Sequence, residues 1–470
     1  MKPASAWKGN SGVENDTIVA IATPQGIGAL AMIRLSGPGA IAIADRVCRS
    51  RQSLAAAPDR TAALAELTAQ DGRPIDQVVA LAMRGPSSAT GEDVVELTCH
   101  GGLLAPRLIL RRLVEEGARP AEPGEFTKRA FLNRKIDLAQ AEAVEEVVRA
   151  STEKALAVAV RQLGGGLSRR IGELEDALVC QLALIDANID FVDEEIDPVD
   201  GRELGRALEA AARGAEELLG AHEGGRYLRE GLRVVIVGRP NVGKSSIFNR
   251  LLGQDRVIVS EVAGTTRDVV DGLVGVGGVL LRVQDTAGVR QPKDGLEQEA
   301  VRRTRLAIAG ADVAVVVVDA REPLNDEDMR VLEEVAGTTA VVVANKTDLA
   351  TAEAGPSLMV RNGGPVKIAA RTSALKGWGI SELAGELAEA ARSRIGDLNC
   401  EVLVNERHAF HLRGALEALR RAMDSQAKDL PLEFVASDVR CALDSLGEIT
   451  GRKVSGAVLD EIFSRFCIGK

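Results

Sequence analysis

The string GRPNVGKSS, residues 238–246, constrains the fold of this chain more than any other feature of its sequence. It fits the pattern G-x-x-x-x-G-K-[ST], in which successive backbone N–H groups surround a phosphate. The β-branched run LRVVIVG (232–238) precedes it, and a helical stretch up to Leu252 follows it. A buried strand that runs into such a loop and then into a helix is typical of a parallel βα unit, so we predict a phosphate-binding loop here.

Four further apolar runs predict more strands of the same sheet. They lie at residues 280–285, 313–319, 340–345 and 366–369, and helical stretches separate most of them. Strands that alternate with helices form parallel βαβ units and a doubly wound sheet. The sequence therefore predicts a P-loop α/β domain with a mostly parallel sheet over residues 231–395.

Three motifs downstream of the loop predict which nucleotide it binds. DTAG (285–288) ends a predicted strand, so its aspartate can reach a Mg²⁺ shell and its glycine N–H a γ-phosphate. NKTD (345–348) ends another strand, and the Asp348 carboxylate can accept both N–H groups on the edge of guanine, which adenine does not offer. TSAL (372–375) can place the Ala374 N–H on the guanine carbonyl. Motifs of these types in this order predict a Ras-like GTPase domain.

The motifs also predict individual roles. Lys244 brings a cation to the β- and γ-phosphates, and the hydroxyls of Ser245 and Thr266 ligate Mg²⁺. Ras-like switches orient the attacking water with a glutamine directly after DTAG, but Val289 stands there, which leaves Glu297 and Glu299 as candidates for that work. The residues predicted to bind GTP are Asn241, Val242, Gly243, Lys244, Ser245, Ser246, Ser260, Glu261, Val262, Ala263, Gly264, Thr265, Thr266, Asp285, Thr286, Ala287, Gly288, Asn345, Lys346, Asp348, Ser373 and Ala374.

The sequence on either side of residues 231–395 has a different pattern of apolar residues. The chain has 470 residues, enough for about three domains. Apolar residues recur at helical spacing before the block (Leu178, Leu182, Ile185) and after it (Leu412, Leu416), which predicts a discontinuous helical domain into which the G domain is inserted. Residues 1–133 mix predicted strands and helices. We therefore expect an N-terminal α+β domain (1–133), two helical segments (134–230 and 396–470) and the G domain (231–395).

Composition excludes some functions. The formal net charge is −10, which excludes a protein that binds nucleic acid nonspecifically along its length. Aromatic residues make up 2% of the chain, too few for a protein that binds single strands by stacking on their bases. Six cysteines are scattered without a CxxC pair, and the sequence has no apolar run near the length of a membrane span. This pattern predicts a cytoplasmic protein without a membrane span.

Several strings resemble those of the tRNA-modification GTPase family MnmE, also called TrmE. They run along nearly the whole chain: DTIVAIATP (16–24), TGEDVVEL (90–97), PGEFTKRAFLN (123–133), KIDLAQAEAV (135–144), DEEID (193–197), GRPNVGKSS (238–246), AGTTRD (263–268), DTAG (285–288) and FCIGK (466–470). The resemblance implies a homodimer formed through the N-terminal domains, with a G domain inserted in a helical domain. It also implies joint action with the FAD-containing flavoprotein MnmG, in a heterotetramer or larger assembly, on the wobble uridine of certain tRNAs.

The resemblance further implies ligands for this family. Its N-terminal domain binds 5-formyl- or methylene-tetrahydrofolate, and the matching positions here are Arg34, Glu96, Lys135 and Lys470. Hydrolysis is activated when two G domains meet across K⁺, whose ligands by motif position are Asn241, Ser260, Val262 and Thr265. Glu297 matches the water-orienting glutamate of the family.

Some positions depart from the family pattern or leave alternatives open. Ile27 stands at a common arginine and Ala89 at a common aromatic, near the expected dimer or folate region. Cys467 is either a reactive thiol or a packing residue. The cluster of Lys128, Arg129, Arg134 and Lys135 is predicted to be a basic patch for a folate tail or tRNA. Two rival functions are a ribosome-assembly or signalling switch and a nucleotide-gated scaffold that only positions MnmG.

Overall fold

The computed structural model describes residues 16–190, 199–254, 271–285, 297–350, 357–359, 365–395 and 402–470. The chain divides into two compact units. The first comprises Met1–Glu145, Gln162–Ala212 and His411–Lys470, and the second comprises Glu146–Arg161 and Arg213–Phe410.

The first unit contains a mixed sheet with the strand order β3-β4-β5-β6-β2-β1-β7. Neighbouring strands are antiparallel except β1 and β7, which are parallel. Helices α1 (Ala40–Val47) and α2 (Ala105–Glu115) cover one face, where Ile33, Leu97 and Leu113 are fully buried. The strands are β1 (Ile18–Ile21), β2 (Leu30–Ser36), β3 (Cys48–Ser50), β4 (Ala62–Thr68), β5 (Pro74–Met83), β6 (Val94–His100) and β7 (Arg119–Pro120).

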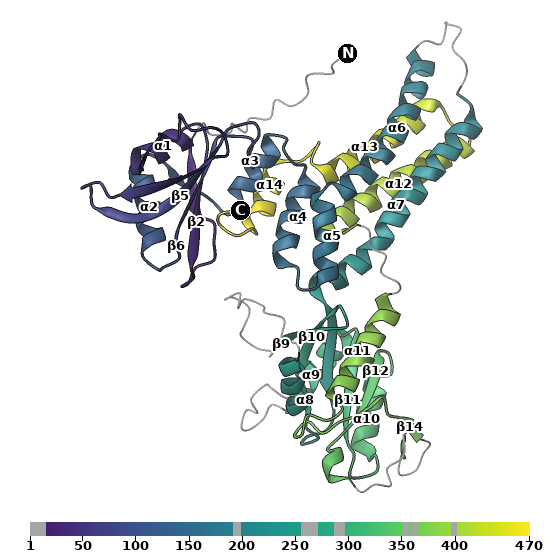
Figure 1. The fold of residues 1–470 in the computed structure, drawn as a ribbon. Helices are drawn as coiled ribbons and strands as arrows, with labels where there is room; N and C mark the ends of the chain where they lie inside the picture. The colour runs from purple at the N-terminus through teal and green to yellow at the C-terminus, as the bar shows by residue number, and fades with distance from the viewer. Residues whose placement is uncertain are drawn as a thin grey trace. The chain divides into compact units, whose positions relative to one another are not determined.

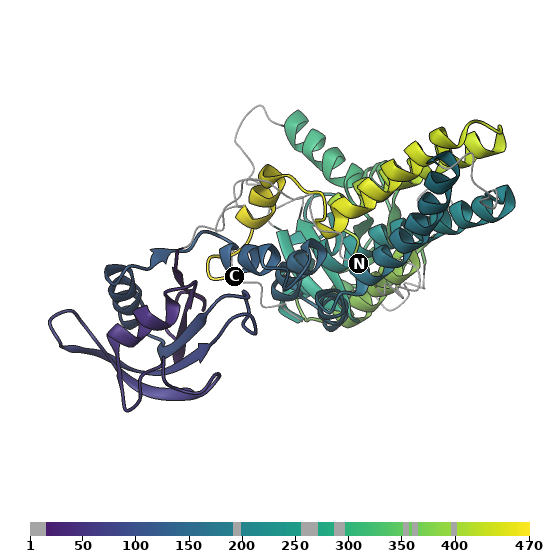
Figure 2. The same ribbon diagram turned by 90° about the horizontal axis from the view of Figure 1, so that it is seen from above.

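Helices from both ends of the sequence pack together in the first unit. Figures 1 and 2 show α6 (Gly166–Asp190) and α13 (Leu432–Thr450) side by side. An ion pair joins α6 to α13, from Arg440 to Asp186 at 2.5 Å, and a second one joins α6 to the residue Arg452 just beyond the end of α13, from Arg452 to Glu175 at 2.9 Å. The other helices lying wholly in this unit are α3 (Glu125–Leu132) and α14 (Gly456–Ser464). Four helices have residues in both units: α4 (Leu138–Arg149), α5 (Glu153–Leu163), α7 (Gly201–Glu230) and α12 (Glu406–Ala427).

The second unit is built around a sheet with the strand order β15-β12-β11-β8-β10-β9. All neighbours are parallel except β9, which pairs antiparallel with β10. Its strands are β8 (Leu232–Val237), β9 (Asp271–Val276), β10 (Val279–Asp285), β11 (Val313–Asp319), β12 (Thr339–Asn345) and β15 (Ala370–Arg371). A separate pair, β13 (Ser357–Met359) and β14 (Pro365–Lys367), lies outside it.

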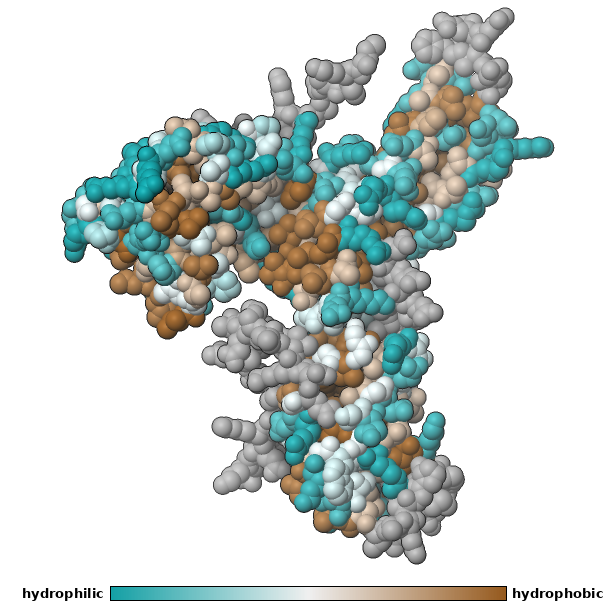
Figure 3. All heavy atoms as spheres, viewed as in Figure 1, coloured by the Kyte–Doolittle hydropathy of each residue, from teal (hydrophilic) through white to brown (hydrophobic). Residues whose placement is uncertain are grey.

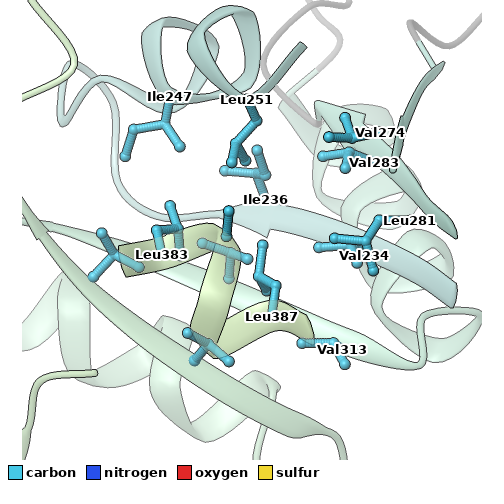
Figure 4. Packing of buried hydrophobic residues seen from close by; sticks show 14 of the residues in the cluster. Val234, Ile236, Ile247, Leu251, Val274, Leu281, Val283, Val313, Leu383 and Leu387 are labelled. Carbon is cyan, nitrogen blue, oxygen red and sulfur yellow. The ribbon is translucent and has the colours of Figure 1, made fainter. Parts of the chain in front are cut away.

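Helices cover both faces of this second sheet. Helices α8 (Lys244–Gln254) and α11 (Ile380–Ile395) share one buried cluster with the sheet, in which Ile236, Ile247 and Leu387 lie together (Figure 4). Helices α9 (Glu297–Ala309) and α10 (Asp326–Glu334) cover the opposite face, where Val316 and Val318 are fully buried. A sheet buried on both sides explains why β11 is an unbroken apolar run up to its last residue.

The structure confirms a chain of several parts, with an N-terminal sheet, helical segments and a mostly parallel P-loop sheet. One strand differs from its prediction: residues 366–369 do not form the sheet strand after β12, because β15 occupies that place and β14 pairs with β13. The division at residues 133, 230 and 395 stays a prediction. Among the described residues, no helix is long and apolar enough to cross a membrane.

Candidate nucleotide-binding site

The loop between β8 and α8 has the backbone shape that a phosphate cradle needs. Gly238 and Gly243 have φ values of +148° and +99°, which side chains other than glycine rarely adopt. A Cβ atom at Gly238 would collide with the carbonyl oxygen of Val317, and one at Gly243 with the side-chain amide of Asn345. Asn241, between them, is also left-handed, at φ +65°. The pattern of two glycines with four residues between them is therefore required by the strands around the loop.

Lys244 is the first residue of α8 and points back over this loop. Its Nζ donates to the carbonyl oxygens of Gly238 and Arg239, at 2.8 and 2.9 Å. Burial lowers the pKa of Lys244, and the charge of Asp285 acts in the opposite direction. The ammonium group is thus held where a phosphate in the loop would contact it. Ser245 and Ser246 follow on α8 and are exposed, while Asp285 ends β10 and is buried.

A cavity of about 560 Å³ adjoins the loop. Three segments line it: the start of α8, the segment after β12 and the segment after β15. Two of these segments directly follow the carboxyl ends of parallel strands, and α8 follows the loop that leaves the carboxyl end of β8. Ligands bind at this edge of α/β sheets. The lining residues are Gly243, Ser246, Asn249, Arg250, Asn345, Lys346, Asp348, Leu349, Ala374 and Leu375.

Asn345 ties the phosphate loop to the two segments predicted to bind the base. Its Nδ2 donates to the carbonyl of Val242 at 2.8 Å. Its Oδ1 accepts from the Thr372 hydroxyl at 3.2 Å and from the Ala374 N–H at 3.1 Å. Asp348 is joined to the same segment, because its Oδ1 accepts from the Ser373 hydroxyl at 2.6 Å. The NKTD and TSAL motifs therefore form one connected wall of the cavity.

Lys346 is held by a carboxylate that the sequence motifs did not indicate. It has a left-handed backbone (φ +68°), and its Nζ donates to Oδ2 of Asp319 at 2.8 Å. Burial acts to raise the pKa of Asp319, but hydrogen bonds from Arg321 and Lys346 outweigh it and hold that pKa well below its usual range. Asp319 is therefore a fixed anion at the end of β11 that orients Lys346 along the cavity. Its only signal in the sequence is an aspartate that ends the apolar run VAVVVVD.

Part of the predicted site falls outside the described residues. These positions are Ser260, Glu261, Val262, Ala263, Gly264, Thr265, Thr266, Thr286, Ala287 and Gly288. Glu297 begins α9 in the structure, and its side chain is outside the description. The described positions Asn241, Val242, Lys244, Asp348 and Ala374 all belong to the phosphate loop or to the cavity wall beside it.

The four predicted folate residues lie in the first unit. Arg34 and Glu96 stand opposite each other on β2 and β6, and the guanidinium donates twice to Glu96 Oε1, at 2.9 and 2.7 Å. The Arg34 guanidinium also lies 5.8 Å from the centre of the Phe126 ring. Lys135 Nζ donates to the carbonyl of Pro86 at 3.0 Å. Arg34 and Glu96 are therefore paired with each other.

The C-terminal segment packs against the same part of the first unit. The N–H of Phe126 donates to the carbonyl of Lys470 at 3.2 Å, and the N–H of Gly124 to that of Cys467 at 3.4 Å. Gly469 is left-handed (φ +95°), and a Cβ atom there would press on the backbone of Ile21. These contacts place Lys470 next to Phe126, which Arg34 also faces. Cys467 is a free, exposed cysteine.

Two of the four residues in the predicted basic patch, Lys128 and Arg129, form ion pairs with carboxylates; the patch itself stays a prediction. Lys128 pairs with Asp460 at 2.7 Å. Arg129 is buried, with ion pairs to Asp16 at 2.6 Å, Glu125 at 3.0 Å and Glu92 at 3.2 Å. Three of these carboxylates, Asp16, Glu92 and Asp460, are distant in the sequence, so the local run of cations could not indicate these pairs.

Comparisons with known proteins agree with this geometry. The family model described as the MnmE helical domain matches residues 138–467, and the one described as the N-terminus of the GTP-binding protein TrmE matches residues 17–135. The chain is 43% identical to the tRNA modification GTPase MnmE of Moorella thermoacetica, covering 97% of this chain and 100% of that protein. It is 42% identical to the protein of the same name from Listeria innocua (97% and 100%) and 44% identical to that from Symbiobacterium thermophilum (97% and 99%).

These matches extend over nearly the full length of both partners, and the structure has a P-loop with a cavity beside it. A GTPase of this kind uses GTP as its substrate and Mg²⁺ as the cofactor that binds with it. The chain belongs to the MnmE family of tRNA modification GTPases and is a GTP hydrolase that acts in tRNA modification.

Proposed function

We propose that this chain couples GTP hydrolysis to addition of a carboxymethylaminomethyl or aminomethyl group at C5 of the wobble uridine of certain tRNAs, in the cytoplasm and together with an MnmG-like FAD protein. The observation that carries the proposal is the full-length similarity to tRNA modification GTPases. A strain that lacks this chain should lose the modified wobble nucleoside in mass spectra of its tRNA and regain it when the chain is returned. Unchanged tRNA in that strain would contradict the proposal.

We propose a role for each residue of the nucleotide site. Backbone N–H groups of the phosphate loop and Lys244 hold the β- and γ-phosphates, and Ser245 with Thr266 holds Mg²⁺. The exposed Ser245 hydroxyl one residue after Lys244 and the buried Asp285 carboxylate are the oxygen groups that Mg²⁺ prefers. Asp348 and the Ala374 N–H bind guanine. Glu297 orients the attacking water, in place of the glutamine that Val289 replaces.

Potassium dependence is a prediction of this proposal. Asn241, with Ser260, Val262 and Thr265, would hold K⁺ between the phosphates of paired G domains; Asn241 is exposed at the loop tip, as such a ligand must be. A cation there offsets charge on the leaving group, so turnover in KCl should exceed turnover in NaCl at equal ionic strength by at least about tenfold. Phosphate release in the two salts measures this. Equal rates would remove K⁺ from the mechanism.

The N-terminal domain is proposed to bind 5-formyl- or methylene-tetrahydrofolate through Arg34, Glu96, Lys135 and Lys470. Its donor set suits the ligand, because cations suit a glutamyl tail and a carboxylate suits the donor edge of a pterin. The Arg34–Glu96 pair must then open or share its hydrogen bonds when the ligand enters. The closeness of Phe126 to both Arg34 and the Lys470 backbone supports placing the C-terminus in this site.

Lys470→Ala is expected to weaken folate binding, because it removes one charge-assisted contact while the Lys470 carbonyl stays available to Phe126. Loss of such a contact should raise the Kd for 5-formyl-tetrahydrofolate by roughly tenfold to a hundredfold in calorimetry of the full chain. Lys453→Ala is the matched control, since Lys453 forms a surface pair with Asp444. An unchanged Kd for Lys470→Ala would exclude this ammonium group from the site.

Homodimerisation through the N-terminal domains is supported by an exposed face of the first sheet. The strand register places Leu30, Leu64 and Val79 on the face opposite the α1–α2 core, and their exposed fractions are 64%, 62% and 43%. Figure 3 shows apolar side chains at the surface of this part of the chain. Apolar residues gathered on one sheet face are typical of an interface. The packing of α6 against α13 likewise supports one helical domain with an inserted G domain.

A further inference from the structure

Arg250 connects the helix that follows the phosphate loop to the segment proposed to bind guanine. It lies on α8, which begins at Lys244. Its Nε donates to the carbonyl of Ala374 at 2.8 Å, and its Nη2 donates to the carbonyl of Leu375 at 2.7 Å. One planar guanidinium therefore holds two successive peptide groups, so both their positions and their orientation are fixed. No motif in the sequence marks this residue.

The segment that Arg250 holds, residues 373–376, has other contacts through its N–H groups and its Ser373 side chain. Ser373 bonds Asp348, and the Ala374 N–H bonds Asn345. The Ser373 N–H donates to the carbonyl of Trp378 at 3.0 Å. Ala374 is buried in the core of the domain, whereas Leu375 is exposed to 74%. The two bonds from Arg250 are made to the carbonyl oxygens of Ala374 and Leu375, so they help to set which way these two peptide groups face.

We propose that Arg250 is a positioning residue for guanine specificity: by holding the carbonyls of Ala374 and Leu375, it fixes the backbone of this segment where it can meet the O6 atom of the base. The proposal rests on the guanine site assigned above and adds a determinant to it. Arg250 itself contacts the protein backbone, so it affects the base only through the position of residues 373–376. The effect should be confined to O6, because the 2-amino and N1–H groups of guanine are assigned to Asp348, which Arg250 does not touch.

Three nucleotides distinguish contacts to O6 from contacts to the 2-amino group. GDP has both O6 and the 2-amino group, IDP keeps O6 and lacks the 2-amino group, and 2-aminopurine riboside diphosphate keeps the 2-amino group and lacks O6. For Arg250→Met, which retains the aliphatic stem and removes both hydrogen bonds, the Kd values for GDP and IDP should each rise roughly threefold to tenfold. The Kd for the 2-aminopurine nucleotide should stay the same. Displacement of a fluorescent GDP from the full chain measures all three.

Two companion variants make the result specific. Arg250→Lys can restore one of the two bonds, so its Kd for GDP should fall between those of the parent and Arg250→Met. Arg305→Met is the matched control, because Arg305 makes a surface pair with Glu334 on the far side of the domain. Arg305→Met should bind all three nucleotides as the parent does and keep the parent kcat for GTP.

The outcomes distinguish this inference from the proposed site itself. If the parent chain binds GDP no better than ADP, the guanine site is wrong. If the parent prefers GDP but Arg250→Met weakens all three nucleotides equally, Arg250 supports the fold of the domain and the inference fails. It also fails if Arg250→Met leaves every Kd unchanged. Should Arg250→Met not fold, the ratio of the GDP and 2-aminopurine Kd values in Arg250→Lys decides in the same way.

Discussion

Lys244→Ala should reduce GTP turnover by at least about a hundredfold, because it removes a preformed cation from the phosphate loop. In the structure the Lys244 ammonium is held by two loop carbonyls, and burial already lowers its pKa, so the charge is partly desolvated before any phosphate arrives. A cation in such a setting interacts more strongly with a γ-phosphate than one in water does. The loss should appear in kcat and in affinity, since charge on the phosphates is present before the reaction and increases during it.

Phosphate release under steady-state conditions, with GTP varied, measures the effect of Lys244→Ala. Lys428→Ala is a suitable control, because Lys428 forms an exposed pair with Asp424 on the surface of α12. Its turnover should match that of the parent. If Lys244→Ala hydrolyses GTP within a few-fold of the parent rate, the phosphates lie elsewhere and the P-loop assignment is wrong.

The elements that the sequence predicts well are those with strong local patterns. The strand predicted at 313–319 is β11 with the same bounds, because six apolar residues followed by an aspartate can hardly form anything else inside an α/β sheet. Several strands were not predicted, among them β4 and β9. β4 is rich in alanine, which has low strand propensity, and it exists through its pairing with β5. β9 contains two glycines and is an edge strand that pairs with β10 through a hairpin.

The candidate site shows the same division between local and distant signals. The motifs place the phosphate loop and the NKTD and TSAL segments, because each motif sits at the end of a strand. The contacts that orient these segments come from residues far away in sequence: Arg250 holds the carbonyl of Ala374, and Asp319 holds Lys346. Neither pairing has a fixed spacing or residue type that a single sequence could reveal. The fold alone brings them together.

Arg129→Met should destabilise the N-terminal part of the chain by about 3 kcal/mol, because it leaves partly buried carboxylates without the buried cation that pairs with them. Arg129 is 4% exposed and pairs with Asp16, Glu92 and Glu125. Arg119 also pairs with Asp16 and Glu125, so the loss falls most heavily on Glu92, which also accepts a hydrogen bond from the Ser36 hydroxyl. Methionine is similar in length, so the effect reports lost charge rather than a cavity.

The destabilisation by Arg129→Met should depend on pH with a defined sign. Burial acts to raise the pKa values of Asp16 and Glu125, but hydrogen bonds from Arg119 and Arg129 outweigh it and hold both below their ordinary values of 3.8 and 4.5. A lowered pKa in the folded state stabilises the fold above the ordinary value, and this stabilisation is lost as pH falls through the folded value. The difference between parent and variant should therefore be full near pH 7 and shrink below about pH 4.

Hydrogen exchange of the amides in β1 and α3, measured in urea, follows unfolding at this cluster rather than in the whole chain. Arg107→Met is the matched control, because Arg107 is exposed on α2 and its replacement should change stability by less than about 0.5 kcal/mol. If Arg129→Met lowers the free energy of unfolding equally at pH 7 and at pH 3, then packing, and not the ion pairs, holds α3 against the sheet. No loss at all would mean that Asp16, Glu92 and Glu125 are satisfied without Arg129, and that the local run of cations from Lys128 to Lys135 is available to a ligand after all.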